Sequence, residues 1–179
     1  MGEDPQALGR RGGQRVRHDR QHRRARPPAQ RRGGQKGGGG DEAIGRSKGG
    51  LSTKIHALVD ALGNPTGFAL SPGQAHDLEG ADALLPDLAA DALIADKAFD
   101  AEERVLRPLA RAGKTAVIPP KANRKEARAY DKDLYKARHL IENFFAKLKQ
   151  YRAIATRYDK RAVHFLGAIH LAAAVVWLN

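Results

Sequence analysis

The sequence contains no cysteine, and only one methionine and one tryptophan occur among its 179 residues. Without cysteine the chain has no disulfide framework and no thiolate metal site, which fits a reducing cytoplasm. No apolar run approaches the roughly 20 residues that span a bilayer, and the arginine-rich N-terminus lacks the apolar core of a secretory signal. We therefore expect a cytoplasmic protein that has no membrane partner.

Acidic residues are also scarce, with 20 Asp and Glu against 32 Lys and Arg, so the formal net charge is +12. A strongly basic chain is a candidate for nucleic-acid binding. Residues 1–40 hold ten arginines and one lysine against Glu3, Asp4 and Asp19, a net charge of +8. This segment has too little apolar surface to offset its chain entropy, so we expect a disordered basic tail. It is either an arm that binds phosphates or a segment without selected structure.

Residues 41–179 have the composition of one globular domain. Alternating apolar residues around a Gly-Asn-Pro turn predict a hairpin, and later segments alternate between short strands and amphipathic helices. The expected strands cover residues 51–62, 66–71, 91–96 and 115–118, and the expected helices cover residues 77–90, 101–112, 134–152 and 163–178. Asp77 is the expected N-cap of the first helix. This order indicates an α/β fold with a mixed sheet flanked by helices.

The helix expected over residues 134–152 has two distinct faces. At about 100° per residue, Tyr135, Arg138, Glu142 and Lys149 fall in one narrow sector, and large apolar residues fall in another. A carboxylate between cations, backed by an apolar stripe, is unusual beside a core. An ordinary explanation is a surface ion pair between Arg138 and Glu142 at i, i+4.

Asp96 is the last residue of the short apolar strand expected over residues 91–96. The end of a buried strand is a position from which a side chain can reach the edge of the sheet. Asp96 can simply cap a turn, but a strand end and a helix face can also bring Asp96 and Glu142 together. Mg²⁺ prefers carboxylate oxygens and water as ligands, and phosphoryl transfer on DNA uses one or two such ions. Arg138 and Lys149 would then meet the DNA backbone, and Tyr135 would position a phosphate or stack on a base.

These four helical residues reproduce the spacing Y-x2-R-x3-E-x6-K, which resembles the signature of bacterial insertion-sequence transposases of the DDE type. Residues 93–100 resemble the segment with the second acid of that family. Residues 45–55 and 171–175 resemble its second strand and its last helix. The resemblance covers about residues 36–179.

The resemblance implies an RNase H-like fold, DNA transposition as the function, and Mg²⁺ or Mn²⁺ as the cofactor. It makes Asp96 and Glu142 the second and third catalytic acids and metal ligands. The implied partners are double-stranded DNA of transposon ends and target, and further copies of the chain in the active complex. In a bacterial cell the protein would lie in the cytoplasm, on the nucleoid when bound to DNA.

The family's first aspartate lies on a strand upstream of the hairpin, and nothing before Leu51 has the pattern of a strand. With suitable synonymous codons, residues 18–28 read in a frame shifted by one base as Met-Ile-Asp-Ser-Thr-Val-Val-Arg-Ala-His-Gln. That peptide resembles the missing strand. We therefore expect the chain, up to a point between Gln30 and Lys36, to be out of frame with the family domain. The domain 41–179 would then lack its first strand and first acid, and the product of an upstream overlapping frame becomes a possible partner.

Three functions remain open at this point. The first is a transposase with weak or no activity alone, because its first acid is missing. The second is a DNA-binding regulator, derived from a transposase, that has lost the chemistry. The third is a basic α/β protein with no role on nucleic acids, which would show no salt-dependent DNA binding.

Overall fold

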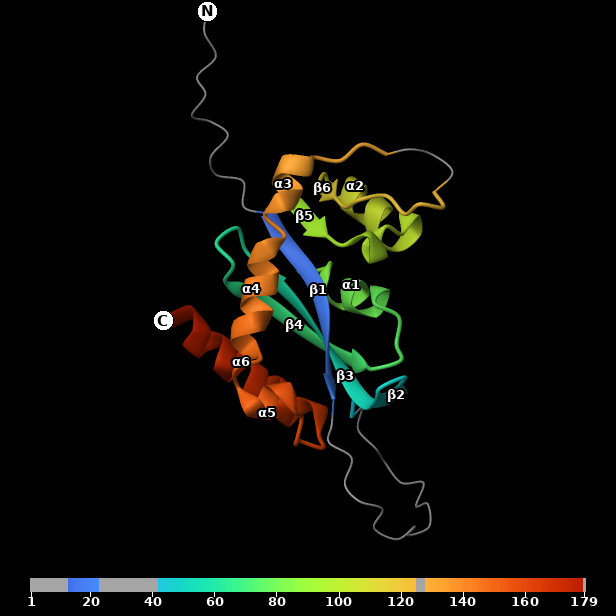
Figure 1. Ribbon diagram of the computed structural model, residues 1–179. Helices are drawn as coiled ribbons and strands as arrows, with labels where there is room; N and C mark the ends of the chain where they lie inside the picture. The colour runs from blue at the N-terminus through green and yellow to red at the C-terminus, as the bar shows by residue number, and fades with distance from the viewer. Residues whose placement is uncertain (1–12, 23–41, 125–127, 179) are drawn as a thin grey trace, which may run out of the picture.

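A twisted sheet carries helices on both of its faces (Figure 1). The computed structural model describes residues 42–124 and 128–178, together with the backbone of residues 13–22. The strands are β1 Gly13–His22, β2 Gly45–Ser47, β3 Gly50–Val59, β4 Pro65–Pro72, β5 Ala92–Ala95 and β6 Thr115–Val117. The helices are α1 Leu78–Leu84, η2 Lys97–Phe99, η3 Glu102–Leu106, α2 Arg107–Arg111, α3 Lys132–Lys136, α4 His139–Leu148, α5 Arg152–Ala155 and α6 Ala162–Leu178. The predicted mixed α/β fold is confirmed.

The strands lie in the order β2-β3-β1-β5-β6, and β4 pairs with the same edge of β3 as β2. β3 runs antiparallel to β1, β2 and β4, whereas β1, β5 and β6 are mutually parallel. Val16 of β1 pairs with Leu58 on one side and with Ala95 on the other. β1 is therefore the strand that joins the antiparallel part of the sheet to the parallel part.

The expectation that no strand precedes Leu51 was wrong, because β1 and β2 both do so. β1 pairs with β3 from Arg15↔Val59 to His22↔Ser52, so the sheet has a strand in the position that we expected to be missing. Strand pairing uses the backbone N–H and C=O groups, which almost every residue carries. An arginine-rich segment can therefore form a strand of the sheet. The other residues of the expected 1–40 tail lie outside the described part of the chain.

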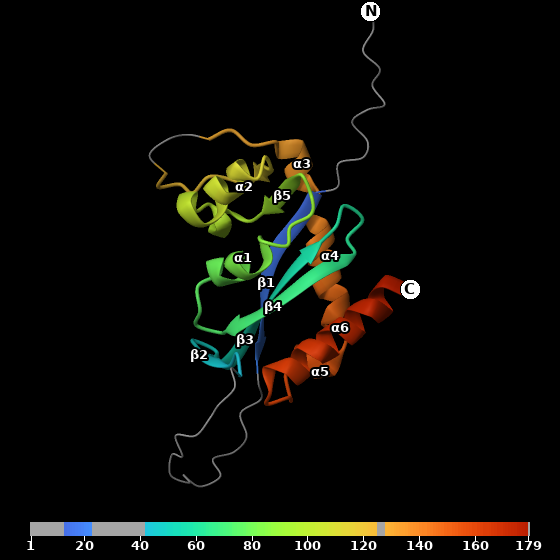
Figure 2. The same ribbon diagram turned by 180° about the vertical axis from the view of Figure 1, so that it is seen from behind.

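Two apolar clusters lie on opposite faces of the sheet, because successive residues of β3 point to opposite sides. Leu58 packs with β5, α1, η3 and α2 on one face. Ile55, Ala57 and Val59 pack with α4, α5 and α6 on the other (Figure 2). In the described part of the chain, none of the helices is long and apolar enough to cross a membrane.

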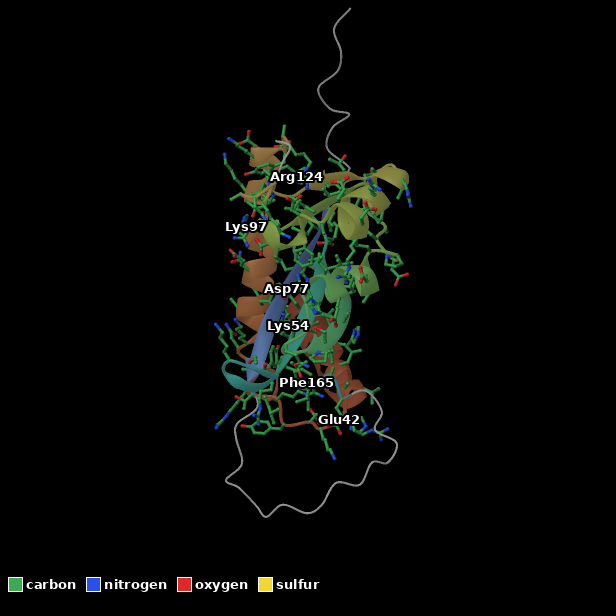
Figure 3. All side chains as sticks on the ribbon, turned by 90° about the vertical axis from the view of Figure 1, so that its right-hand side faces the viewer. Glu42, Lys54, Asp77, Lys97, Arg124 and Phe165 are labelled. Atoms are coloured by element: carbon green, nitrogen blue, oxygen red, sulfur yellow. The ribbon has the colours of Figure 1, made fainter. Side chains whose placement is uncertain are left out.

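α1 is shorter than expected, and Asp77 does not cap it with its side chain. Leu85 still has helical backbone and donates to the carbonyl of Ala81, but Pro86 has no backbone N–H to continue the helix. Asp77 instead accepts a hydrogen bond at 2.5 Å from Nζ of Lys54, whose side chain is 3 % exposed (Figure 3). A buried ammonium needs a charged partner, and that need outweighs the capping preference of Asp77.

Arg157 ties three distant segments together although it is almost completely buried. Its guanidinium donates to the carbonyl oxygen of Glu42 at 2.8 Å and to the hydroxyl of Thr53 on β3. Its Nε donates to the carbonyl of Asp159, and its Cζ lies 4.7 Å from the ring centroid of Phe165 on α6. Glu42 and Phe165 lie close together at one end of the molecule in Figure 3. One side chain thus anchors the chain before β2 and the loop before α6 to the sheet.

Replacing Arg157 by Ala should lower the free energy of unfolding by about 3 kcal/mol, because buried carbonyl oxygens and a hydroxyl lose their donor. Urea denaturation followed by circular dichroism measures this change. The control is Arg152→Ala, since Arg152 is exposed on α5 and its loss should cost less than about 0.5 kcal/mol. Equal effects of the two substitutions would contradict the anchoring role of Arg157.

Candidate active site

Asp96 directly follows β5, as predicted. Leu93, Ile94 and Ala95 are completely buried, whereas the side chain of Asp96 is 32 % exposed. Its backbone is extended and it precedes η2 without capping it by its side chain. The first solvent-accessible side chain after the C-terminal end of β5 is therefore the carboxylate of Asp96.

The helix expected over residues 134–152 is broken into α3, α4 and α5, which corrects the prediction of one continuous helix. Between α3 and α4 the amide groups of Ala137, Arg138 and Leu140 bond three residues back, to Leu134, Tyr135 and Ala137. Such bonds tighten the backbone relative to an α-helix. Arg138 consequently lies at the junction between α3 and α4, one helical turn before Glu142.

One guanidinium holds both acids of the candidate site. Arg138 Nη1 lies 2.9 Å from Oδ1 of Asp96, and its Nη2 lies 3.0 Å from Oε1 of Glu142. The predicted i, i+4 ion pair between Arg138 and Glu142 is therefore present. The structure also brings Asp96, 46 positions earlier in the chain, to the same cation.

Tyr135 lies beside this group on α3. Its hydroxyl donates to Oδ1 of Asp96 at 3.5 Å, and its ring centroid lies 5.8 Å from Cζ of Arg138. Tyr130 packs edge-on against the same ring at 5.5 Å. Burial and, next, the negative charge of Asp96 raise the pKa of the Tyr135 phenol, although Arg138 opposes this shift. At neutral pH the phenol is therefore protonated, and it donates a hydrogen bond to the carboxylate of Asp96.

Lys149 does not join this group. It is the exposed C-cap of α4, seven residues after Glu142 and so about 10 Å further along the helix axis. Helical periodicity predicted that Lys149 shares a face with Glu142, and this prediction took no account of the distance between them along the helix.

The two carboxylates are of the ligand type that a hard divalent cation prefers, but two protein ligands do not make a complete metal site. Asp96 and Glu142 offer partly exposed carboxylate oxygens, which Mg²⁺ and Mn²⁺ prefer, and a guanidinium already shows that one cation can contact both. Among the residues with described side chains, no group of three His, Asp or Glu could hold a metal. A complete site therefore needs a further ligand.

A family model described as "Transposase DDE domain" matches residues 11–177. The chain belongs to the DDE transposase family. A relative from Brucella ovis, named "Putative transposase for insertion sequence element IS6501", is 41 % identical over 130 residues, which are 72 % of this chain and all of the relative. No solved structure matches the chain. The resemblance stated from the sequence is confirmed, but the match begins at residue 11 rather than near residue 36, so it also covers β1. The protein is a DNA transposase of the DDE type.

The sequence analysis missed two residues that support the site of this transposase. Asp100, whose side chain is 1 % exposed, accepts from Arg124 Nη1 at 2.6 Å and from the backbone N–H of Lys121 at 2.8 Å. These contacts hold the segment around Lys121 and Arg124 against the residue that follows η2. Arg124 and Lys97 of η2 lie toward the same end of the molecule in Figure 3. Asp100 and Arg124 are 24 positions apart, so no local pattern in the sequence indicated their pairing.

The sequence analysis placed a third acid, Asp19, in an unstructured tail, but it lies on β1 and pairs with Ile55. The β1–β5 register ends at Val16↔Ala95, so its continuation by one residue brings Arg17 level with Asp96. Asp19 occupies a register position on the same face, about 7 Å further along the strand.

The pKa shift of Tyr135 gives a test that is independent of activity. Absorbance titration of tyrosinate in the wild-type protein, minus that of Tyr135→Phe, should have its midpoint above pH 10. Asp96→Asn should lower this midpoint because it removes a negative charge, and Asp133→Asn, at an exposed carboxylate on α3, should leave it unchanged. The folded state holds this proton more tightly, so its contribution to stability is complete below pH 10 and is lost above it. A midpoint at or below pH 10 would contradict the geometry.

Proposed function

We propose that this transposase cleaves and joins DNA at transposon ends with a divalent cation bound to Asp96 and Glu142. The observation that carries the proposal is the position of Arg138, whose guanidinium contacts both carboxylates at about 3 Å. Two acids that contact one guanidinium lie near each other, so a small movement of their side chains would let them share a metal ion. Mg²⁺ or Mn²⁺ at this position would activate the attacking oxygen and stabilise the leaving oxygen of a phosphodiester.

The other residues of the signature have supporting roles in this proposal. Arg138 and Lys149 bind phosphates of double-stranded DNA, the first beside the acids and the second further along α4. The hydroxyl of Tyr135 donates a hydrogen bond to Asp96 in the free protein, and Tyr135 contacts a phosphate or a base when DNA is bound. Their spacing along α3 and α4 suits a duplex that lies along these helices rather than across them.

We also propose that the domain is RNase H-like and that it acts on the bacterial chromosome as a homo-oligomer. The fold assignment rests on the strand order β4-β3-β1-β5-β6, with β3 antiparallel to its neighbours and β1, β5 and β6 parallel. Asp96 then stands next to the central strand, at the end of the adjacent parallel strand. An oligomer would hold the two ends of a transposon in one complex.

A third carboxylate has two candidate sources. The first is the strand in the shifted reading frame, whose peptide Met-Ile-Asp-Ser-Thr-Val-Val carries an aspartate among apolar residues. The second is Asp19, which shares a sheet face with the Asp96 position in the β1–β5 register. We favour the shifted frame because the sequence of β1 is highly charged, whereas a strand with neighbours on both sides in a helix-covered sheet is usually apolar. The chain alone is then weakly active, and a non-catalytic DNA-binding regulator is the alternative function.

The gene sequence tests the shifted frame directly. We expect an open frame, displaced by one base, that encodes the apolar strand over the codons of residues 18–28 and meets the present frame before that of Lys36. A stop codon within that stretch, or a different peptide, would remove the proposal and leave Asp19 as the remaining candidate.

Catalysis is tested with a chain in which the frame is corrected, on DNA that carries the transposon ends, with Mg²⁺. We expect end cleavage by the corrected chain, and a loss of at least about 100-fold on Asp96→Asn or Glu142→Gln, because even indirect ligand partners are worth 10–100-fold. Glu103→Gln, at an exposed carboxylate on η3, is the matched control and should retain activity. Full activity of Glu142→Gln would exclude Glu142 as a ligand.

The present chain belongs in the same assay. Activity that Asp19→Asn abolishes would assign the third carboxylate to Asp19. Salt-dependent DNA binding without cleavage would favour the regulator.

A further inference from the structure

Arg138 contacts both acids of the site in a way that conflicts with metal binding. The guanidinium of Arg138 lies between the two carboxylates and contacts Oδ1 of Asp96 and Oε1 of Glu142, which are oxygens that a shared metal ion would use. A divalent cation and Arg138 would repel each other at such short range. The acids can therefore bind the guanidinium or the metal ion through these oxygens, but not both.

We propose that Arg138 is a built-in substitute for the metal ion, and that it must leave the acids before the metal binds and DNA is cleaved. This inference rests on the proposed metal site. In the metal-free protein, the single positive charge of the guanidinium offsets part of the repulsion between the two carboxylates and holds them near each other. The site is thus assembled before any metal is present.

The exchange needs little rearrangement. The side chains of Arg138, Asp96 and Glu142 are 28 %, 32 % and 38 % exposed, so water and hydrated cations reach all three. Arg138 lies at the α3–α4 junction, where its side chain can turn without unwinding α4. It also has a second partner, since its Cζ already lies within cation–π distance of the Tyr135 ring.

Release of Arg138 from the acids would also couple metal binding to DNA binding. Once it leaves the carboxylates, its donors are available to a phosphate, for which a guanidinium is well suited. Metal binding should therefore strengthen DNA binding, and DNA should strengthen metal binding by the same factor. Arg138 would be a positioning residue of the free protein and a phosphate ligand of the complex.

Mn²⁺ titration of the full chain, with free Mn²⁺ followed by electron paramagnetic resonance, tests the exchange. Arg138→Gln should bind Mn²⁺ about tenfold or more tightly than the wild type, because a competing charge is gone. Arg138→Lys keeps a charge but cannot contact both acids in the same way, so it should be intermediate. Lys136→Gln is the control, since it removes an equal charge from an exposed position on α3 and should change the affinity less than about twofold.

The coupling gives a second readout. Mn²⁺ should increase the affinity of the wild-type chain for duplex DNA severalfold more than that of Arg138→Gln. In EDTA the variant should melt at a lower temperature than the wild type, and Mn²⁺ should restore more of its melting temperature.

The outcomes separate this inference from the proposed function. If the wild type binds Mn²⁺, Asp96→Asn abolishes binding and Arg138→Gln binds no more tightly, the exchange is wrong and the metal site stands. If neither wild type nor Arg138→Gln binds Mn²⁺, or Asp96→Asn and Glu142→Gln bind it as well as the wild type, the proposed metal site itself is wrong. If Arg138→Gln does not fold, the Arg138→Lys titration decides, and affinity equal to or weaker than that of the wild type would overturn the exchange.

Discussion

β1 makes one sheet out of two parts. β2, β3 and β4 form an antiparallel group, β5 and β6 form a parallel pair, and β1 is the strand that pairs with both. Asp96 belongs to the parallel part, whereas Glu142 lies on α4, which packs on Ile55, Ala57 and Val59 of the antiparallel part. The distance between the two acids therefore depends on the ladder of β1, together with the packing of α3 beside β5 and β6. A change in that ladder would alter the site without touching any of its side chains.

The sequence of this strand conflicts with its position. Arg15 pairs with Val59 on one side and with Ile94 on the other, and both of these partners are completely buried. Backbone hydrogen bonding permits a ladder of almost any composition, but sequences evolved for a fold usually agree with it at the local level as well. A local conflict confined to the central strand, beside neighbours that obey the expected apolar pattern, is what translation in the wrong frame would produce.

The sequence predicted the parts of the site that depend on local geometry. A helical period of 3.6 residues placed Arg138 one turn before Glu142, and the end of an apolar segment placed Asp96 at the edge of the sheet. It did not predict β1, because strand formation there is decided by the open edges of β3 and β5 rather than by the segment's own composition. Long-range charge pairs were missed for the same reason, since Asp77 gave up its capping role to neutralise Lys54, which is buried by the fold. For both β1 and Asp77, interactions with distant parts of the fold outweigh the preference of the local sequence.

The acids of the site show how a fold can gather like charges before a metal arrives. Two carboxylates near each other repel, and the chain supplies its own counter-charge from the same helical segment, which is also part of the family signature. Arg138 therefore has two opposing effects in the proposed site. It stabilises the two acids in the free protein, and it would compete with a metal ion for the same carboxylates. In the proposed exchange, DNA would relieve this opposition, since a phosphate beside the site would offer the guanidinium another anion of similar geometry. If the proposed exchange is right, metal would bind this site more tightly when DNA is present, which would favour cleavage of bound DNA.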